Sequence, residues 1–243
     1  MTEVCGHESS DMHINARELW ESTKSKKGMP LTDSMPVIKA RTSMDGVLFT
    51  TARYKFVARM LEPRKKAAAL ELGCNNGFGT RYVRQRCDLS KLVGVDFDHE
   101  AIEVAKAEVA DEVCEFLEGD FLLHDYKPLS PRGEYDCVYS MDVIEHIPQQ
   151  DEQKFVDTIW QNLSKDGFAV VGTPNVTMYP YANPWNKLRH INNFDQQRLY
   201  DLLSTRFNQV FMFGMTDEVL HTGFYPMCCY VMALACQKRD EEF

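Results

Sequence analysis

The chain has 243 residues, of which 44% are hydrophobic and 26% are charged, and its formal net charge is −9. This balance is typical of a folded globular domain and excludes a disordered tail. The negative charge repels a phosphate backbone, so we expect no nucleic-acid partner. The longest uncharged apolar stretch, residues 227–236, is much shorter than the ~20 residues of a membrane helix. The first residues have no features of a secretion signal, so we expect a cytoplasmic protein without a membrane partner.

The eight cysteines include no CxxC pair, and most of them lie inside apolar segments. We expect them to be buried free thiols, as in proteins of a reducing compartment. Cys5, His7 and His13 have the side-chain types of metal ligands. The stretch around them is polar, however, and we expect no metal in this protein.

Residues 1–65 are predicted to form an N-terminal arm with cover helices. Residues 24–36 are rich in helix breakers and indicate a linker, with a short helix near 16–23 before it. A second helix is expected over 51–61, because its apolar side chains share one helical face. These side chains are Tyr54, Val57, Ala58 and Leu61.

From residue 66 onward, predicted strands alternate with predicted helices, which indicates a parallel sheet covered on both faces. The expected strands are 67–72, 91–96, 113–118, 135–140, 167–173, 209–214 and 226–236. The expected helices are 80–87, 99–109, 152–163 and 196–204, with Asp98 as an N-cap. The last two strands have no helix between them, which predicts an antiparallel hairpin at the sheet edge. The fold class is therefore α/β, a Rossmann-like doubly wound sheet of seven strands over residues 66–243, compact with the arm.

The segment ELGCNNGFGT joins the end of the first predicted strand to a helix. Its glycines, which include Gly73 and Gly77, let the backbone approach a ligand closely. Ligands of open α/β sheets bind at this carboxyl edge. Neither a G-x-G-x-x-G fingerprint nor a P-loop can be read here, so the turn itself favours neither NAD nor ATP. A tight strand–helix turn without a ligand is the alternative.

Acidic residues follow the next three predicted strands in order. Asp96 ends the second strand, and a carboxylate there can accept hydrogen bonds from both hydroxyls of a ribose. Asp120 and Phe121 follow the third strand, where a carboxylate can bind an exocyclic amine while the ring covers a purine. Residues 140–147, SMDVIEHI, follow the fourth strand. Helix capping can account for a single acidic residue at the end of a strand. It does not account for acidic residues at the ends of several successive strands along one edge of the sheet.

With these motifs the chain resembles the class I S-adenosylmethionine (SAM) dependent methyltransferases over about residues 67–240. The resemblance implies SAM as cofactor and S-adenosylhomocysteine (SAH) as product. It assigns the glycine turn to the amino-acid part of SAM, the acid after the second strand to ribose and the acid after the third to adenine. The implied cofactor-binding residues are Glu71, Gly73, Asn75, Gly77, Asp96, Phe97, Asp120, Phe121, Ser140 and Met141.

Asn75 departs from this family's pattern, which most often has glycine at that position. Asparagine also tolerates a positive φ, so the turn can still form. The resemblance further implies that the N-terminal arm covers the cofactor and that Arg53 or Tyr54 reaches its carboxylate. A helix that merely packs on the sheet is the alternative for these two residues.

A narrower likeness lies in GTPN at 172–175, NPW at 183–185 and residues 190–203. These segments are similar to the branch that methylates sugars, small natural products and quinone precursors. The likeness implies O-methylation of a small polar acceptor, such as a sugar, a nucleotide-linked glycan precursor or a natural product. The loop 175–193 offers aromatic rings and cations to such an acceptor, although it is equally read as an ordinary surface loop. The candidate substrate-binding residues are Tyr179, Tyr181, Trp185 and Arg189.

A hydroxyl acceptor must lose its proton, and histidine is suited to accept it. His146 follows the fourth strand, close to the expected position of the methyl group, and His190 ends the loop after the fifth strand. Glu145 can orient His146 or bind the acceptor. These three are the candidate catalytic residues. The alternatives are a histidine that frames the pocket, one that anchors the loop, and a glutamate that caps a turn or faces solvent.

Other functions stay open at this point. N- or C-methylation of a small metabolite fits the same fold, because the sequence does not identify the acceptor atom. An NAD-dependent oxidoreductase is the rival from another enzyme class, and a catalytically silent SAM-binding partner subunit is the rival that is not an enzyme. The sequence makes no prediction of the oligomeric state.

Overall fold

The computed structural model describes residues 17–18 and 44–240. Of the short helix predicted near 16–23, only residues 17–18 are described, and both are helical. Cys5, His7 and His13 lie outside the described residues. All the cysteines within them are free, and most are buried, as the sequence predicts.

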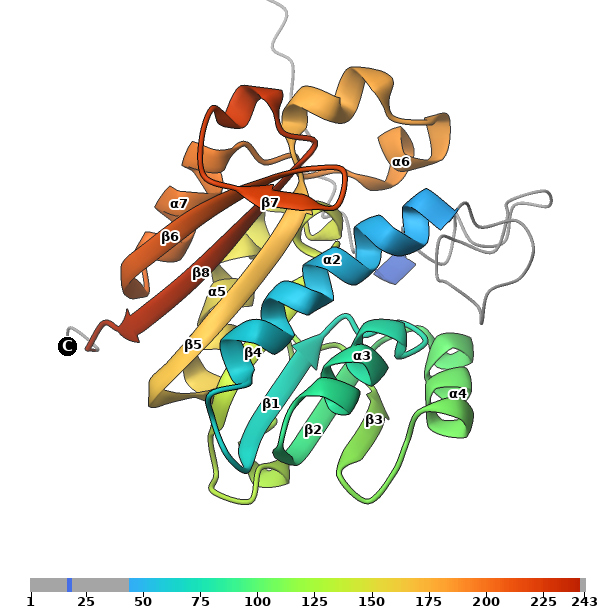
Figure 1. Ribbon diagram of the computed structural model, residues 1–243, viewed down its shortest axis with the longest axis vertical. Helices are drawn as coiled ribbons and strands as arrows, with labels where there is room; N and C mark the ends of the chain where they lie inside the picture. The colour runs from blue at the N-terminus through green and yellow to red at the C-terminus, as the bar shows by residue number, and fades with distance from the viewer. Residues whose placement is uncertain (1–16, 19–43, 241–243) are drawn as a thin grey trace, which may run out of the picture.

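The described residues form one sheet with the strand order β3-β2-β1-β4-β5-β8-β6-β7 (Figure 1). The first five strands pair in parallel, whereas β8, β6 and β7 pair antiparallel at one edge. The strands are β1 Ala67–Leu72, β2 Leu89–Asp96, β3 Cys114–Glu118, β4 Tyr135–Met141, β5 Leu163–Pro174, β6 Phe207–Thr216, β7 Val219–His221 and β8 Tyr230–Lys238. The predicted Rossmann-like class and its C-terminal hairpin of β6 and β8 are confirmed.

The sheet differs from the prediction in having an eighth strand. β7 lies inside the segment that was expected to be only a connection, and it pairs with β6 alone. Its three residues are exposed or half-buried. A strand of that length at an edge leaves no alternation of apolar and polar residues to detect. In contrast, every residue of β1 is buried, as expected for a central strand covered on both faces.

The helices are α2 Met44–Leu61, α3 Phe78–Arg86, α4 His99–Glu108, α5 Glu152–Asn162, α6 Pro184–Arg189 and α7 Gln196–Ser204. Helices α2, α3 and α4 cover one face of the sheet, and α5 and α7 cover the other (Figure 1). Each face therefore has its own apolar cluster. None of the helices in the described part of the chain is long and apolar enough to cross a lipid bilayer.

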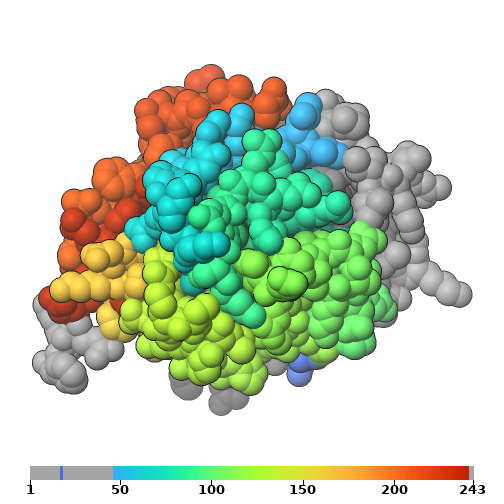
Figure 2. All heavy atoms as spheres, turned by 60° about the horizontal axis from the view of Figure 1, so that its bottom comes forward, coloured from blue at the N-terminus to red at the C-terminus, as the bar shows by residue number. Residues whose placement is uncertain are grey.

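Helix α2 brings the N-terminal segment onto the sheet. Its four predicted apolar side chains are all buried, at 8% exposure or less. The helix starts at Met44, seven residues before the predicted start at 51. In the space-filling view, α2 in blue and cyan lies directly against α3 in green (Figure 2). The cover helix is thus held beside the turn that joins β1 to α3.

Candidate active site

The turn between β1 and α3 is built from three residues with positive φ: 78° at Gly73, 46° at Asn75 and 77° at Gly77. Asn75 therefore adopts the left-handed conformation that was expected of it. A β-carbon on Gly73 would lie 2.2 Å from Cγ2 of Val143, so a larger residue does not fit there. The turn is consequently specified by its glycines and lies against the segment that follows β4.

Asp96, at the end of β2, fastens this turn. One carboxylate oxygen accepts a hydrogen bond from the Asn75 N–H at 2.8 Å, and the other accepts one from the Asp98 N–H at 2.9 Å. Burial raises the pKa of Asp96 to about 6. Asp98 in turn caps α4, as predicted, by accepting from the N–H groups of Glu100 and Ala101. A carboxylate therefore stands between the glycine turn and the start of α4.

Glu71 lies beneath the turn, with no solvent exposure. Its Oε2 accepts hydrogen bonds from the hydroxyls of Thr80 and Tyr139, the latter at 3.0 Å. Burial raises its pKa to about 7. Its Oε1 is buried and has no hydrogen-bond partner among the described residues. The side chain is thus an anchor under the turn that still has one polar atom to satisfy.

The cover helix α2 approaches the turn through Tyr54 and Arg53. A β-carbon on Gly79 would lie 1.9 Å from the Tyr54 ring, so only glycine allows this contact. The Arg53 guanidinium is buried between two rings, 4.2 Å from the centroid of Phe49 and 3.9 Å from that of Tyr230. It also forms a salt bridge with Asp142, at the end of β4. In this structure Arg53 therefore links α2 to β4.

Glu145, His146 and His190 come together as the sequence analysis expected. The short helical turn Ile144–His146 follows β4, and His190 directly follows α6. The two imidazole rings lie 5.0 Å apart at an angle of 80°. Nδ1 of His146 lies 3.1 Å from the Arg189 carbonyl oxygen, and the Asn192 N–H donates to the Glu145 carbonyl oxygen at 3.1 Å. These two contacts hold the end of the loop 175–193 against the turn after β4.

The interior of this cluster disfavours charge. Burial, with the neighbouring Asp142 as the second cause, raises the pKa of Glu145 to about 8. Burial, with the neighbouring His190 as the second cause, lowers the pKa of His146 to about 3. Burial also lowers the pKa of His190. One Glu145 oxygen accepts from the Thr173 hydroxyl at 2.9 Å, and the other, Oε1, is buried without a partner among the described residues.

Several predicted cofactor contacts have their side chains engaged in the interior. The Ser140 hydroxyl donates to the Leu72 carbonyl at 2.8 Å, and Met141 is buried. The Phe121 ring is also buried and packs against Phe155, with centroids 6.0 Å apart. The ring that was expected to cover a purine is therefore occupied by core packing, because it points to the face that α5 covers. The assignment of these three residues to the cofactor stays a prediction.

Phe97 and Asp120 lie at the same edge of the sheet and are less buried than Ser140, Met141 and Phe121. Both are half-buried. Asp120 accepts a hydrogen bond from the Leu122 N–H at 2.9 Å, which closes the turn after β3. Phe97 directly follows Asp96 at the end of β2. Together with Asp96, they lie at the carboxyl ends of β2 and β3, where the resemblance places the nucleoside of the cofactor.

The loop after β5 has more structure than expected. The segment Val176–Tyr181 is a 3-10 helix, and Pro184–Arg189 is α6. The Asn183 side chain accepts from the Asn186 N–H at 2.8 Å, and a proline follows at the first helical position. This combination is a helix-start signal that was present in NPW and was not used.

The four candidate acceptor contacts on this loop are placed differently. Arg189 is buried at 8% exposure, and Tyr181 is 80% exposed. Tyr179 is 37% exposed, and Trp185 is half-buried. Arg189 is close enough to lower the pKa values of both His146 and His190, behind burial as the main cause. The structure therefore brings Arg189 to the histidines and turns Tyr181 toward solvent.

Some residues of the site were missed by sequence reasoning. Tyr139, Thr173 and Tyr230 were not singled out, although each contacts a candidate residue. Tyr139 and Tyr230 lie in apolar strand segments, where nothing in the local pattern separates them from core residues. Thr173 belonged to the GTPN segment without a role of its own. Asp142 belonged to a quoted motif without a role, and its φ of 59° is a signal that only the structure reveals.

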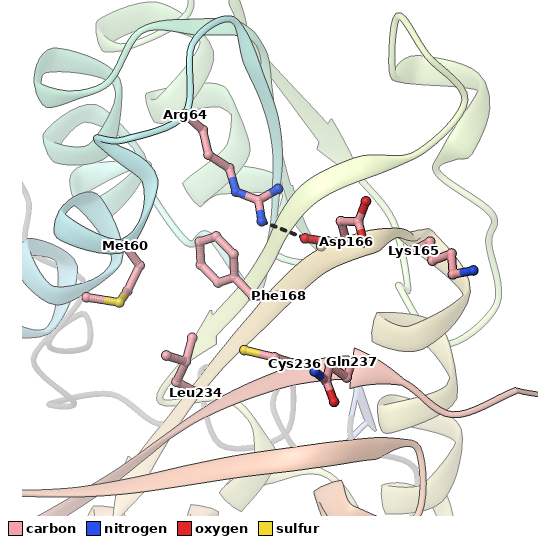
Figure 3. A pocket seen from close by; sticks show the side chains of 9 residues that line it. Met60, Arg64, Lys165, Asp166, Phe168, Leu234, Cys236 and Gln237 are labelled. Atoms are coloured by element: carbon pink, nitrogen blue, oxygen red, sulfur yellow. Dashed lines mark hydrogen bonds between the residues drawn. The ribbon is translucent and has the colours of Figure 1, made fainter.

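A separate hollow of about 310 Å³ lies at the opposite edge of the sheet (Figure 3). Its lining includes Met60, Arg64, Phe168 and Leu234, near the start of β5 and the end of β8. The Arg64 guanidinium crosses it and donates to the Asp166 carbonyl at 2.5 Å. This hollow is formed at the amino ends of the parallel strands, away from the glycine turn, so it is not the candidate active site.

Comparison with known proteins identifies the domain. Residues 70–171 match the family model described as a methyltransferase domain. The match shows a methyltransferase domain in this part of the chain. The match includes the glycine turn, Asp96, Asp120 and the Glu145–His146 pair, so it covers both sides of the candidate site. The resemblance read from the sequence is confirmed at this level, whereas the O-methylating branch stays a prediction.

Curated relatives of this methyltransferase domain match about half of the chain. It is 26% identical over 122 residues to cyclopropane-fatty-acyl-phospholipid synthase of Escherichia coli (strain K12), covering 50% of this chain and 30% of that protein. It is 24% identical over 140 residues to small RNA 2'-O-methyltransferase of Mus musculus, covering 53% of this chain and 34% of that protein. The chain thus spans about a third of the length of these relatives.

A solved structure shares the fold over more of the chain. It is the complex between the Haloferax volcanii Trm112 methyltransferase activator and the putative methyltransferase, with a TM-score of 0.63 and 15% identity. The similarity covers 82% of this chain and 95% of that one. At this identity the likeness establishes the methyltransferase fold.

Proposed function

We propose that the chain is a SAM-dependent O-methyltransferase that acts on a hydroxyl of a small polar acceptor. The choice of a hydroxyl rests on the cluster of Glu145, His146 and His190 after β4. One side-chain nitrogen or oxygen atom of each lies within 4.8 Å of the others. A neutral amine has a lone pair ready for attack, whereas a hydroxyl must lose a proton. Groups that assist that loss are needed only for the hydroxyl.

The cofactor side of the site fits SAM. The turn between β1 and α3 lies over the buried carboxyl of Glu71 and is fastened by Asp96, which is the arrangement expected for binding the amino-acid part of SAM. We assign Asp96 to the ribose hydroxyls and Asp120 to the adenine amine, with Phe97 beside the base. Bound SAM supplies an electrophilic methyl group. Helix α2 covers this side and excludes water from it.

The acceptor side must place a nucleophilic atom ~3–3.5 Å from that methyl group, in line with its bond to sulfur. Arg53 and Asp142 hold α2 against the end of β4, and the loop 175–193 is held by its contacts with Glu145 and His146. The acceptor pocket is thus bounded on two sides by segments that are tied together. Arg189, Tyr179 and Trp185 are the loop side chains that we assign to acceptor binding.

A 2'-hydroxyl of RNA is the second candidate acceptor. The mouse relative is named for 2'-O-methylation of small RNA, and a ribose hydroxyl has the same chemistry as the hydroxyl of a sugar. The formal net charge of −9 opposes RNA binding and favours the small acceptor.

The test is transfer of a labelled methyl group from SAM to a panel of acceptors. The panel holds sugars, nucleotide-linked sugars, phenols, a short RNA with free 2'-hydroxyls, and matched amines in place of the hydroxyls. We expect label on a hydroxylated small molecule and none on its amine analogue. Transfer only to amines, or only to RNA, would contradict the proposal.

A further inference from the structure

The side chains of Glu145, His146 and His190 are of types that bind metal ions, and they lie close together. Each offers one nitrogen or oxygen atom, and these atoms lie within 4.8 Å of one another. Two ligand atoms that are each ~2.1 Å from one ion are at most ~4.2 Å apart. The observed spread exceeds this limit by a small margin, so the three side chains must move closer together to hold one ion.

The Glu145 carboxyl gives independent evidence for a ligand. Glu145 is 2% exposed, and its Oε2 is satisfied by the Thr173 hydroxyl. Its Oε1 has no hydrogen-bond partner within the described part of the chain, although it is fully buried. Buried polar atoms without a partner are rare and require an explanation such as an ion. A cation bound at Oε1 provides one.

His146 is oriented as a ligand would be. Its Nδ1 lies 3.1 Å from the Arg189 carbonyl oxygen, and because a carbonyl only accepts, this nitrogen carries the proton. The lone pair of the neutral ring is therefore on Nε2. Metal-binding histidines commonly donate their other ring N–H to a backbone carbonyl in this way, which fixes the tautomer and the ring.

We propose that Glu145, His146 and His190 bind one divalent first-row transition-metal ion, which holds the acceptor's hydroxyl oxygen. Two imidazoles and one carboxylate suit such an ion better than Mg²⁺ or Ca²⁺, which prefer oxygen ligands alone. Three protein ligands leave a position for an oxygen of the acceptor. The buried guanidinium groups of Arg189 and Arg53 oppose a cation here. Arg53 already pairs with Asp142, so the charge that favours the ion is the Glu145 carboxylate.

The role of the ion in catalysis rests on the proposed function. Coordination lowers the pKa of a bound hydroxyl, so the acceptor O–H releases its proton to water near neutral pH. The oxygen then forms a bond to the methyl carbon as the carbon–sulfur bond breaks, and that electron pair goes to sulfur. The balanced products are the methyl ether, SAH and one proton.

Metal binding is tested on the full chain after EDTA treatment, by titration with MnCl₂ while free Mn²⁺ is followed by electron paramagnetic resonance. Mn²⁺ is chosen because the free ion is visible to electron paramagnetic resonance and because, unlike softer ions, it does not favour thiols. We expect one equivalent to bind. His146→Ala and His190→Ala are each expected to weaken binding at least tenfold. The control His221→Ala removes a half-buried histidine of β7, which is not in the cluster, and is expected to bind as the unaltered chain does.

Glu145→Gln is the second variant, because its amide oxygen can still accept from Thr173 while the charge is lost. It is expected to weaken Mn²⁺ binding at least tenfold. SAH binding, measured on the same samples by calorimetry, reports folding and is expected to be unchanged.

Failure to bind one equivalent of Mn²⁺, or equal binding by the three cluster variants, would overturn the metal site while leaving SAH binding intact. Stoichiometric Mn²⁺ binding that the three variants lose, in a chain that does not bind SAH, would support the metal site and contradict the proposed function.

Discussion

The two halves of the candidate site are assembled in different ways. The cofactor half comes from one stretch of chain, between Glu71 and Asp120, and depends largely on backbone conformation. The acceptor half combines Glu145 and His146 with Thr173 and His190, which are distant in sequence. The first half is therefore recognisable as a motif, whereas the second exists only when the sheet and the loop 175–193 are in place.

The largest effect is expected from variants that disrupt the acceptor half alone. His146→Ala and His190→Ala should each lower turnover by about 10²–10⁴-fold, because the acceptor hydroxyl loses assistance in giving up its proton. SAH affinity should change by less than about twofold, since neither side chain belongs to the cofactor half. Turnover is measured as labelled methyl transfer to the acceptor found in the panel, and affinity by calorimetry. Unchanged turnover in both variants would show that the proton leaves by another route.

The next largest effect is expected from a variant that disrupts the cofactor half. Gly73→Ala puts a β-carbon at a φ of 78°, 2.2 Å from Cγ2 of Val143. Left-handed strain and overpacking together should lower the free energy of unfolding by about 2–5 kcal/mol. Gly133→Ala is the control, because Gly133 has a φ of 77° and nothing within 4 Å of the added carbon. Urea denaturation should show the control losing only about 1–2 kcal/mol; equal losses would mean that the contact with Val143 is unimportant.

The variant Asp96→Ala tests the assignment of the Asp96 carboxylate to the ribose hydroxyls of the cofactor. Hydrogen bonds to a charged group contribute roughly 1.5–3 kcal/mol, so SAH affinity should fall about 10–100-fold without unfolding of the chain. Calorimetry measures the affinity, and circular dichroism checks the fold. Asp136→Ala removes a carboxylate at the opposite edge, where it pairs with Arg64, and should leave the affinity unchanged. An Asp96→Ala variant that binds SAH as tightly as the unaltered chain would remove Asp96 from the site.

A smaller effect is expected from pH. Burial raises the pKa of Asp96 to about 6, and only the ionised carboxylate can accept from both ribose hydroxyls. SAH affinity should therefore be constant above pH 7 and fall as the pH drops through 6. Asp96→Asn should lack this dependence, because an amide does not titrate. A slope below pH 6 that persists in Asp96→Asn would assign it to another group.

The smallest effect concerns the structure of the acceptor loop. Asn183→Ala removes the side-chain cap of α6, which should lower the stability of this short helix by about 1 kcal/mol. Hydrogen exchange should show faster opening of residues 184–189, with no change in α5. Equal protection in the two chains would mean that the contacts of Arg189 and His190, rather than the cap, hold the helix.

Sequence reasoning was accurate where the signal is local. The buried run of β1, the Asp98 cap and the positive φ at Asn75 each follow from residue types within a few positions. It was incomplete where tertiary packing decides the outcome. The three residues of β7 form a strand only beside β6, the Phe121 ring packs against Phe155 of α5, and Arg53 of α2 pairs with Asp142 after β4. The cofactor roles given to Phe121 and Arg53 stay predictions. The cap in NPW was a local signal that was overlooked, so α6 was predictable in principle.

Binding of SAH is the most direct test of the central claim, that the carboxyl edge of β1, β2 and β4 holds the adenosyl cofactor. Isothermal titration of the full chain with SAH, and separately with NAD, measures it. The account predicts one equivalent of SAH bound and no binding of NAD. Binding of NAD in place of SAH, or of neither, would contradict it.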